Sequence, residues 1–201
     1  MAATPQERRE QLVKLFHEAR GCERCELSQS RSQVVFGAGN ADADLMFVGE
    51  APGAEEDRQG LPFVGRSGAL LTRMLGDAGI AREDVFIANT LKCRPPSNRD
   101  PEIAEIETCR PWLNEQIRLI EPRVVATLGN FATKLLTGDK TGITRVHGRP
   151  QVRQIGTRTV FLLPLFHPAA ALRAKGTADL LAADLATLPD LISRPLPEAG
   201  A

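Results

Sequence analysis

Cysteines are the residues best suited to a special chemistry in this chain of 201 residues. Cys22 and Cys25 form a C-x-x-C pair, and Cys93 and Cys109 follow much later in the sequence. If the fold brings the four thiolates together, they suit either a zinc ion or a [4Fe–4S] cluster, and the number of ligands does not separate the two. Alternatively, Cys109 is a core residue, because it lies on the apolar face of a predicted helix.

Polar residues stand where three predicted strands end. Glu50 ends the apolar run 44–50, Asn89 lies near the end of the run 84–90, and His167 follows the run 159–166. Ligands of open parallel sheets bind at the carboxyl ends of the strands, so we expect these side chains to share a site. The amide of a buried Asn can donate and accept hydrogen bonds at once. The alternatives are that Asn89 caps a loop and that His167 has a structural role.

The predicted loop over residues 50–66 is rich in Gly, Pro and acidic residues. Glu55, Glu56 and Asp57 follow Glu50 within it, and Phe63 comes near its end. The acidic residues could belong to a solvated surface loop or to the wall of a pocket. Phe63 could be a core residue or a flat apolar surface for a planar ligand.

Strands and helices alternate along the chain. Apolar spacing predicts helices over residues 4–20, 67–78, 100–120, 130–137 and 177–188, buried strands over 44–50, 84–90, 123–128 and 159–166, and an irregular hairpin over 142–158. Asp100 is expected to cap the third helix, with Pro101 at its first position. This pattern predicts an α/β fold with a parallel sheet covered by helices on both faces. Residues 1–188 are expected to form one domain, followed by a loose C-terminal tail over 189–201.

The composition is that of a globular protein. Hydrophobic residues make up 42% of the chain, and no apolar stretch is long enough for a membrane span or a signal peptide, so a cytoplasmic protein is expected. The net charge is zero, which excludes a protein that coats DNA by charge alone and leaves only a local basic patch. Arginines far outnumber lysines, which phosphate contacts or genomic base composition would each explain. The sequence lacks glycine-rich phosphate-binding motifs, which argues against nucleotide hydrolysis and dinucleotide binding.

Five motifs follow one another along the chain. They are Cys22-x-x-Cys25; Gly49-Glu50-Ala51-Pro52-Gly53; Leu61-Pro62-Phe63-Val64-Gly65; Leu91-Lys92-Cys93-Arg94-Pro95-Pro96, followed by Asn98, Arg99 and Cys109; and His167-Pro168-Ala169-Ala170. In this order they resemble the family 4 uracil-DNA glycosylases, and the resemblance covers residues 20–175. It implies a three-layer αβα sandwich around a mainly parallel four-stranded sheet, and a structural [4Fe–4S] cluster held by the four cysteines.

The same resemblance assigns roles in catalysis. Glu50 would lie beside the deoxyribose and the attacking water, and His167 would donate a hydrogen bond to uracil O2 as the base leaves. Asn98 also matches a family position and is a further catalytic candidate, although it could equally cap the following helix. Leu172 and Arg173 would belong to the loop that enters the DNA when uracil flips out.

The resemblance also implies a uracil pocket, formed by Gly49, Ala51, Glu56, Phe63, Asn89 and His167. Phe63 would stack on the base, and Asn89 would read O4 and N3–H. Glu56 would exclude the methyl group of thymine, while Gly49 and Ala51 would allow close approach of the backbone.

The implied activity is hydrolysis of the N-glycosidic bond of uracil in DNA, without a strand-cutting lyase step. Uracil-containing DNA is then the partner, and a monomer is expected. A related subtype traps uracil-DNA covalently through a histidine in an extra basic loop. Here the corresponding segment, residues 92–100, is short and contains no histidine, which argues against that subtype. A metal-stabilised binding module without catalysis is the other alternative.

Overall fold

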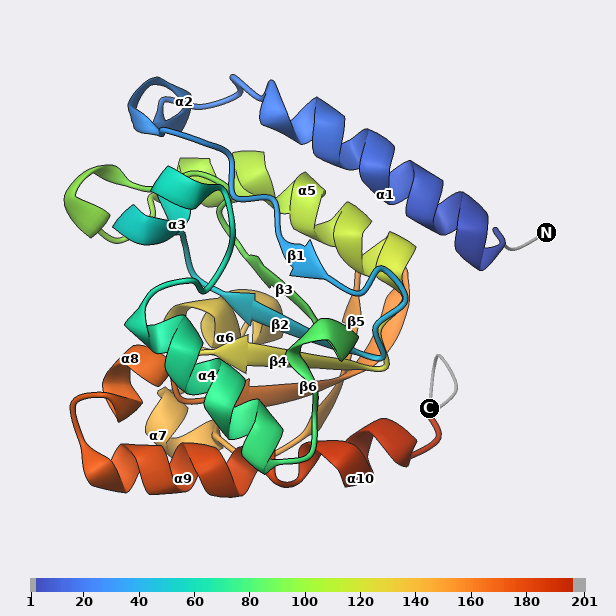
Figure 1. Ribbon diagram of the computed structural model, residues 1–201, viewed down its shortest axis with the longest axis vertical. Helices are drawn as coiled ribbons and strands as arrows, with labels where there is room; N and C mark the ends of the chain where they lie inside the picture. Colours follow the sequence, from blue (N-terminus) through green and yellow to red (C-terminus); the bar gives the residue numbers. More distant parts are fainter. Residues whose placement is uncertain (1–2, 197–201) are drawn as a thin grey trace.

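A six-stranded sheet forms the middle of three layers (Figure 1). The structure is a computed structural model, and it describes residues 3–196. The strand order is β1 (Ala38–Gly39), β3 (Phe86–Asn89), β2 (Leu45–Gly49), β4 (Val124–Leu128), β6 (Arg158–Leu165) and β5 (Gln151–Ile155). The four inner strands are parallel, and β1 and β5 pair antiparallel at the two edges. The predicted α/β sandwich is confirmed, but the sheet has two more strands than the four predicted.

The inner strands were predictable because they are almost wholly apolar. Every residue of β2, β3 and β4 is buried, as expected for parallel strands covered on both faces. The edge strands lack this signal. β1 has only two residues, and β5 carries polar side chains with partly exposed positions along most of its length.

Helices cover both faces of the sheet. On one face, α1 (Pro5–Arg20) packs against α5 (Ile103–Ile120), and α6 (Asn130–Thr137) joins the same hydrophobic core. The other face carries α4 (Arg66–Asp77), α8 (Pro168–Ala171), α9 (Lys175–Leu185) and α10 (Leu188–Ser193). Short helices lie in the connections: α2 (Leu27–Ser30), α3 (Ala54–Gln59), α7 (Ile143–Val146) and the 3₁₀ turns Arg82–Asp84 and Pro96–Asn98. Within residues 3–196, every helix is too short or too polar to span a membrane.

The chain reverses its direction across the sheet at β2. From β2 it passes through α4 to β3 on one side, and from β3 it returns through α5 to β4 on the other side of β2. Because α4 and α5 cover opposite faces, the connections that follow β2 and β3 lie on opposite sides of the sheet at the carboxyl end of β2. This is the position at which open α/β sheets bind ligands.

Two local predictions were wrong. α5 begins at Ile103 rather than after Asp100, because Glu102 and Glu105 form a reciprocal capping box that stabilises a later start. The segment expected to be a loose tail from residue 189 instead continues as α10, whose Leu188 and Leu191 are buried in the core. The remainder of the predicted tail from residue 197 lies outside the described residues.

The start of α4 packs tightly against the loop that carries Phe63. A Cβ atom on Gly68 would overlap the carbonyl oxygen of Phe63 and lie 2.9 Å from its Cα. Gly76, further along the same helix, has no neighbouring atom within 4 Å of such a Cβ. Gly68 therefore has no room for a side chain, whereas Gly76 has open space around it.

We expect Gly68→Ala to lower the free energy of unfolding by ~1–3 kcal/mol, because the added methyl group must displace backbone. Gly76→Ala is the matched control, and it should stabilise the protein by ~0.5–1 kcal/mol through helix propensity alone. Urea unfolding of both variants checks this. Equal effects of the two substitutions would contradict the proposed contact.

Candidate active site

The carboxyl ends of β2 and β3 place Gly49 beside Asn89. The two residues are paired in the parallel register, and Asn89 is 2% exposed. A Cβ atom on residue 49 would overlap Asn89 Oδ1 and lie 3.0 Å from the Phe63 ring, so glycine is needed for this close approach. The Asn89 amide is not among the fully enclosed polar atoms of residues 3–196 that lack a hydrogen-bond partner. Because an amide can donate and accept hydrogen bonds at once, its position suits a ligand with a mixed hydrogen-bonding edge.

Phe63, whose ring lies beside Gly49, has a strained backbone. Its φ is +52°, a left-handed conformation that bulky residues rarely adopt. Arg82 Nη2 donates to the carbonyl oxygens of Pro62 and Phe63, at 3.0 and 3.2 Å. These bonds hold the loop from outside, so the ring stays against Gly49. Strain held in this way is typical of functional sites.

His167 follows the end of β6 and lies next to Phe63. Its ring centroid is 5.7 Å from that of Phe63. The amide of Ala169 donates a 3.0 Å hydrogen bond to His167 Nδ1. Burial lowers the pKa of His167 to about 4, although the negative charge of Glu56 opposes this effect. At neutral pH the imidazole is therefore uncharged and carries its proton on Nε2, where it can donate to a ligand.

Glu50 follows Gly49 and is half-buried. The amide of Leu91 and the hydroxyl of Thr90 both donate to its backbone carbonyl, which fixes the chain beyond β2. Burial raises the pKa of the Glu50 carboxyl, and the negative charge of Asp100 adds to the effect. A carboxyl with a raised pKa at the end of a strand is a candidate for proton or charge chemistry.

Glu56 connects α3 to the Phe63 loop. Its Oε1 accepts hydrogen bonds of 3.2 Å from the amides of Val64 and Gly65. Beside it a recess of about 360 Å³ is lined by residues from α3, the start of α4 and the end of α8, including Leu172 and Arg173. Leu172 is 43% exposed there. The two residues predicted for the DNA-entering loop therefore border the recess formed by Glu56.

The structure does not bring every predicted site residue next to Asn89, Phe63 and His167. Asn98 is exposed in the 3₁₀ turn, with a left-handed backbone, and its Oδ1 accepts a 2.8 Å hydrogen bond from Arg94 Nε. No contact of Asn98 with Asn89 or His167 supports a catalytic role. Ala51 is half-buried next to Glu50 and packs against the core on the α5 side.

The four cysteines come together, although they lie far apart in the sequence. Cys22, Cys25, Cys93 and Cys109 all line one cavity, together with Arg31 and Trp112 among others. All four thiols are free. Arg31 Nη1 lies 3.4 Å from Cys93 Sγ, and the Lys92 amide lies 3.3 Å from Cys109 Sγ. Within residues 3–196, no three or more His, Cys, Asp or Glu side chains are arranged to hold a metal ion.

Comparison with known proteins gives the family. Residues 36–189 match the family described as the uracil DNA glycosylase superfamily. A type-4 uracil-DNA glycosylase of Sulfurisphaera tokodaii is 42% identical over 189 residues, which are 92% of this chain and 86% of that protein. A type-4 uracil-DNA glycosylase of Thermotoga maritima is 46% identical over 167 residues, 82% of this chain and 85% of that protein. This chain belongs to the type-4 uracil-DNA glycosylase family.

One residue of this type-4 chain had not been singled out from the sequence. Lys92 is 2% exposed, and its ammonium donates to the carbonyl of Asn89 at 2.8 Å and to Gln116 Oε1 at 2.6 Å. Burial lowers its pKa to about 8. Lys92 therefore fixes the backbone carbonyl of Asn89, and it lies next to Cys93 in the sequence. Its position between an apolar strand and a cysteine was the sequence feature that could have identified it.

The state of His167 can be measured directly. In a histidine-labelled ¹⁵N NMR titration, His167 should remain neutral, with its proton on Nε2, from neutral pH down towards pH 4, because protonation would bury an uncompensated charge. A His167→Gln variant assigns the signal among the three histidines of the chain. Titration of that signal near the ordinary histidine value of about 6.5 would contradict the prediction.

Proposed function

We propose that this protein is a uracil-DNA glycosylase that hydrolyses the N-glycosidic bond of uracil in DNA and leaves an abasic site, the first step of base excision repair. The single observation that carries the proposal is that Asn89, Phe63 and His167 lie together at the carboxyl end of the sheet, beside Gly49. They bring a side-chain amide, an aromatic ring and a neutral imidazole whose Nε2–H is left to donate. The type-4 relatives share most of their length with this chain.

Uracil fits these groups as a flat base with a mixed hydrogen-bonding edge. Phe63 offers a stacking surface, and the Asn89 amide can accept from N3–H while it donates to O4. Cytosine presents the reverse pattern at these two positions, so a fixed Asn89 would reject it. The carboxylate of Glu56, held by two backbone amides, would stand near the 5-position and exclude thymine. Gly49 and Ala51 would let the backbone approach the base.

Bond cleavage needs charge to be stabilised on both fragments. The departing uracil gains negative charge, and the Nε2–H of His167 would donate to its O2. The sugar gains positive charge, and Glu50 would stabilise it and hold the attacking water. His167 must be uncharged to keep Nδ1 as an acceptor for Ala169, and its lowered pKa meets that need. Leu172 and Arg173 would fill the DNA stack after the base has flipped.

A lyase step is not part of the proposal. Lys92, the lysine beside Asn89, is fully buried and its ammonium is engaged by two acceptors, so it is unavailable for a Schiff base with the sugar. The product would therefore be an intact strand with an abasic site.

The activity is tested with a single-stranded oligonucleotide that carries one uracil. The wild-type protein should release uracil and leave an alkali-labile abasic site, while a covalent protein–DNA adduct or unchanged DNA would contradict the proposal. Asn89→Asp should lower the excision rate for uracil by ~10-fold or more, because a carboxylate cannot donate to O4. The same variant is assayed on cytosine. A wild-type uracil rate in Asn89→Asp would remove this residue from base recognition.

We further propose that the four cysteines hold a [4Fe–4S] cluster with a structural role. The chemistry of the donor set fits: four thiols line one cavity, and a guanidinium and a backbone amide approach two of the sulfurs. A tetrahedral zinc site needs all four sulfurs ~2.3 Å from one ion, whereas a cluster binds each thiolate to a separate iron. When bound, the cluster would cross-link the segment after α1 to the segment around α5. Without it, burial raises the pKa of Cys93 to about 11, so a metal centre is needed to keep the thiolate.

Iron and sulfide content, measured on protein purified without oxygen, tests this cofactor. The wild-type protein should be brown, with broad absorbance at about 400 nm. Cys93→Ser should lose iron and unfold at a lower temperature, while the control Thr108→Ala keeps all four thiols beside the same cavity and should keep its iron. A colourless wild-type protein that contains zinc would contradict the cluster.

A further inference from the structure

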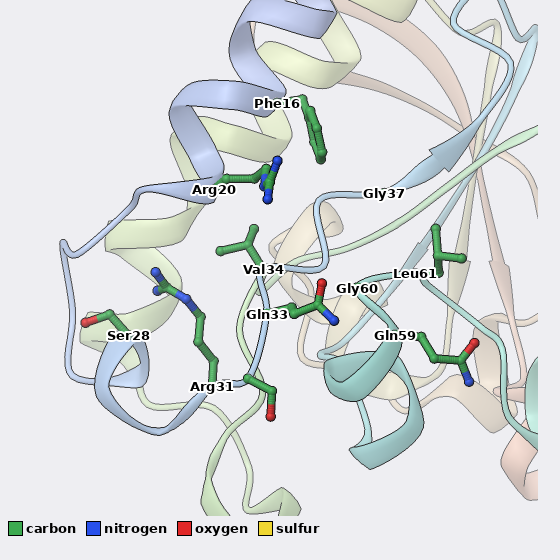
Figure 2. A pocket seen from close by; sticks show the side chains of 11 residues that line it. Phe16, Arg20, Ser28, Arg31, Gln33, Val34, Gly37, Gln59, Gly60 and Leu61 are labelled. Carbon is green, nitrogen blue, oxygen red and sulfur yellow. The ribbon is translucent and has the colours of Figure 1, made fainter.

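A groove lies between the end of α1 and the end of α3 (Figure 2), and neither Phe63 nor His167 lines it. It has a volume of about 560 Å³, within the range of ~300–1,000 Å³ that is typical of ligand sites. Residues from the end of α1, from α2 and the segment after it, and from the end of α3 surround it. They include Phe16, Arg20, Ser28, Arg31, Gln59 and Leu61.

The charge of this groove is one-sided. Arg20 and Arg31 line it, and none of the residues that line it is acidic. Arg31 also lines the cysteine cavity, where its Nη1 lies 3.4 Å from Cys93 Sγ, so Arg20, which is exposed, is the cation available to a ligand in the groove. In a chain with zero net charge, a guanidinium without a lining carboxylate favours an anion, and arginine geometry suits phosphate in particular.

The groove also offers a flat apolar surface. The guanidinium of Arg20 lies 5.6 Å from the centroid of the Phe16 ring, and Phe36 supports that ring edge-on at 5.6 Å. Leu61 is 47% exposed at the opposite end. An aromatic ring beside arginines is the combination with which proteins bind unpaired bases and their phosphates.

The groove is close to the proposed uracil pocket. Glu56 of α3 contacts the Phe63 loop, whereas Gln59, almost one helical turn further along, lines the groove. Leu61 lines the groove two residues before Phe63. The segment 56–63 therefore borders both the groove and the proposed pocket.

We propose that this groove binds the single-stranded continuation of the DNA strand that carries uracil, with a phosphate at Arg20 and an unpaired base against Phe16. This inference rests on the proposed glycosylase function and extends it to a second contact with the substrate. Duplex DNA would not bind in this way, because its bases are already stacked and paired with one another and none is available to contact Phe16.

The test uses single-stranded oligothymidylates that contain one 2′-fluoro-2′-deoxyuridine, which resists hydrolysis. Three probes are compared by fluorescence anisotropy: a short one, one extended only on the 5′ side of the uridine, and one extended only on the 3′ side. Wild-type protein should bind one extended probe more tightly than the other two. Arg20→Glu should weaken binding of that probe roughly tenfold and leave the short probe unchanged, and Arg20→Ala should reduce its salt slope by about 0.7.

Arg73→Glu is the matched control, because Arg73 is an exposed arginine on α4 that does not line the groove. It should leave all three affinities unchanged. Equal losses in Arg20→Glu and Arg73→Glu, equal losses for both extended probes, or no loss at all would each overturn the groove proposal. The unfolding temperature of each variant confirms that it is folded.

The two proposals fail in different ways. If the wild-type protein excises uracil from short DNA but Arg20→Glu binds every probe normally, the glycosylase stands and the groove is rejected. If Arg20 governs binding of an extended probe but no uracil is released from any DNA, the groove stands and the glycosylase is rejected.

Discussion

The parallel register of β2 with β3 is the constraint on which the site depends. It pairs Gly49 with Asn89, and it does so at the strand where the chain changes direction across the sheet. Every other group is placed relative to this pair. The Phe63 ring packs where a side chain on residue 49 would stand, and His167 lies next to that ring. A shift of one residue in this register would turn the Asn89 side chain to the opposite face of the sheet, away from Gly49 and Phe63.

The acidic residues near the site are compatible with a DNA-binding enzyme because most of them are already engaged. Glu55 pairs with Arg58 at 2.7 Å, and Glu56 accepts from two backbone amides. Asp57 is buried, and its two oxygens accept from the amide of Ser32 at 3.0 and 3.1 Å. These contacts offset part of the negative charge that would repel phosphate, and they stabilise α3. Glu50, which under the proposed function acts on the sugar, is half-buried beyond the end of β2.

The sequence predicted the parts of the structure that depend on continuous apolar runs or on local motifs. The four inner strands, the long helices and the gathering of Cys22, Cys25, Cys93 and Cys109 all followed from such patterns. What it missed depends on partners distant in sequence or on competing caps. β1 and β5 exist because β3 and β6 offer free edges, and α10 is stable because Leu188 and Leu191 enter a core built by other elements. Asn98 matched a family position; its Oδ1 accepts a hydrogen bond from Arg94, and its catalytic role stays a prediction.

The cysteine-lined cavity and the pocket are linked by three consecutive residues. Arg31 contacts Cys93 Sγ, the amide of Ser32 binds Asp57, and Gln33 Nε2 donates to the carbonyl of Arg58 at 2.6 Å. Asp57 and Arg58 belong to α3, which also presents Glu56 to the Phe63 loop. A cofactor held by these cysteines would therefore act on the pocket by fixing the position of α3. Such a cofactor would need no contact with the reacting bond. Under the proposed function, Glu56 excludes a single methyl group, so α3 would have to hold it to within a fraction of an ångström.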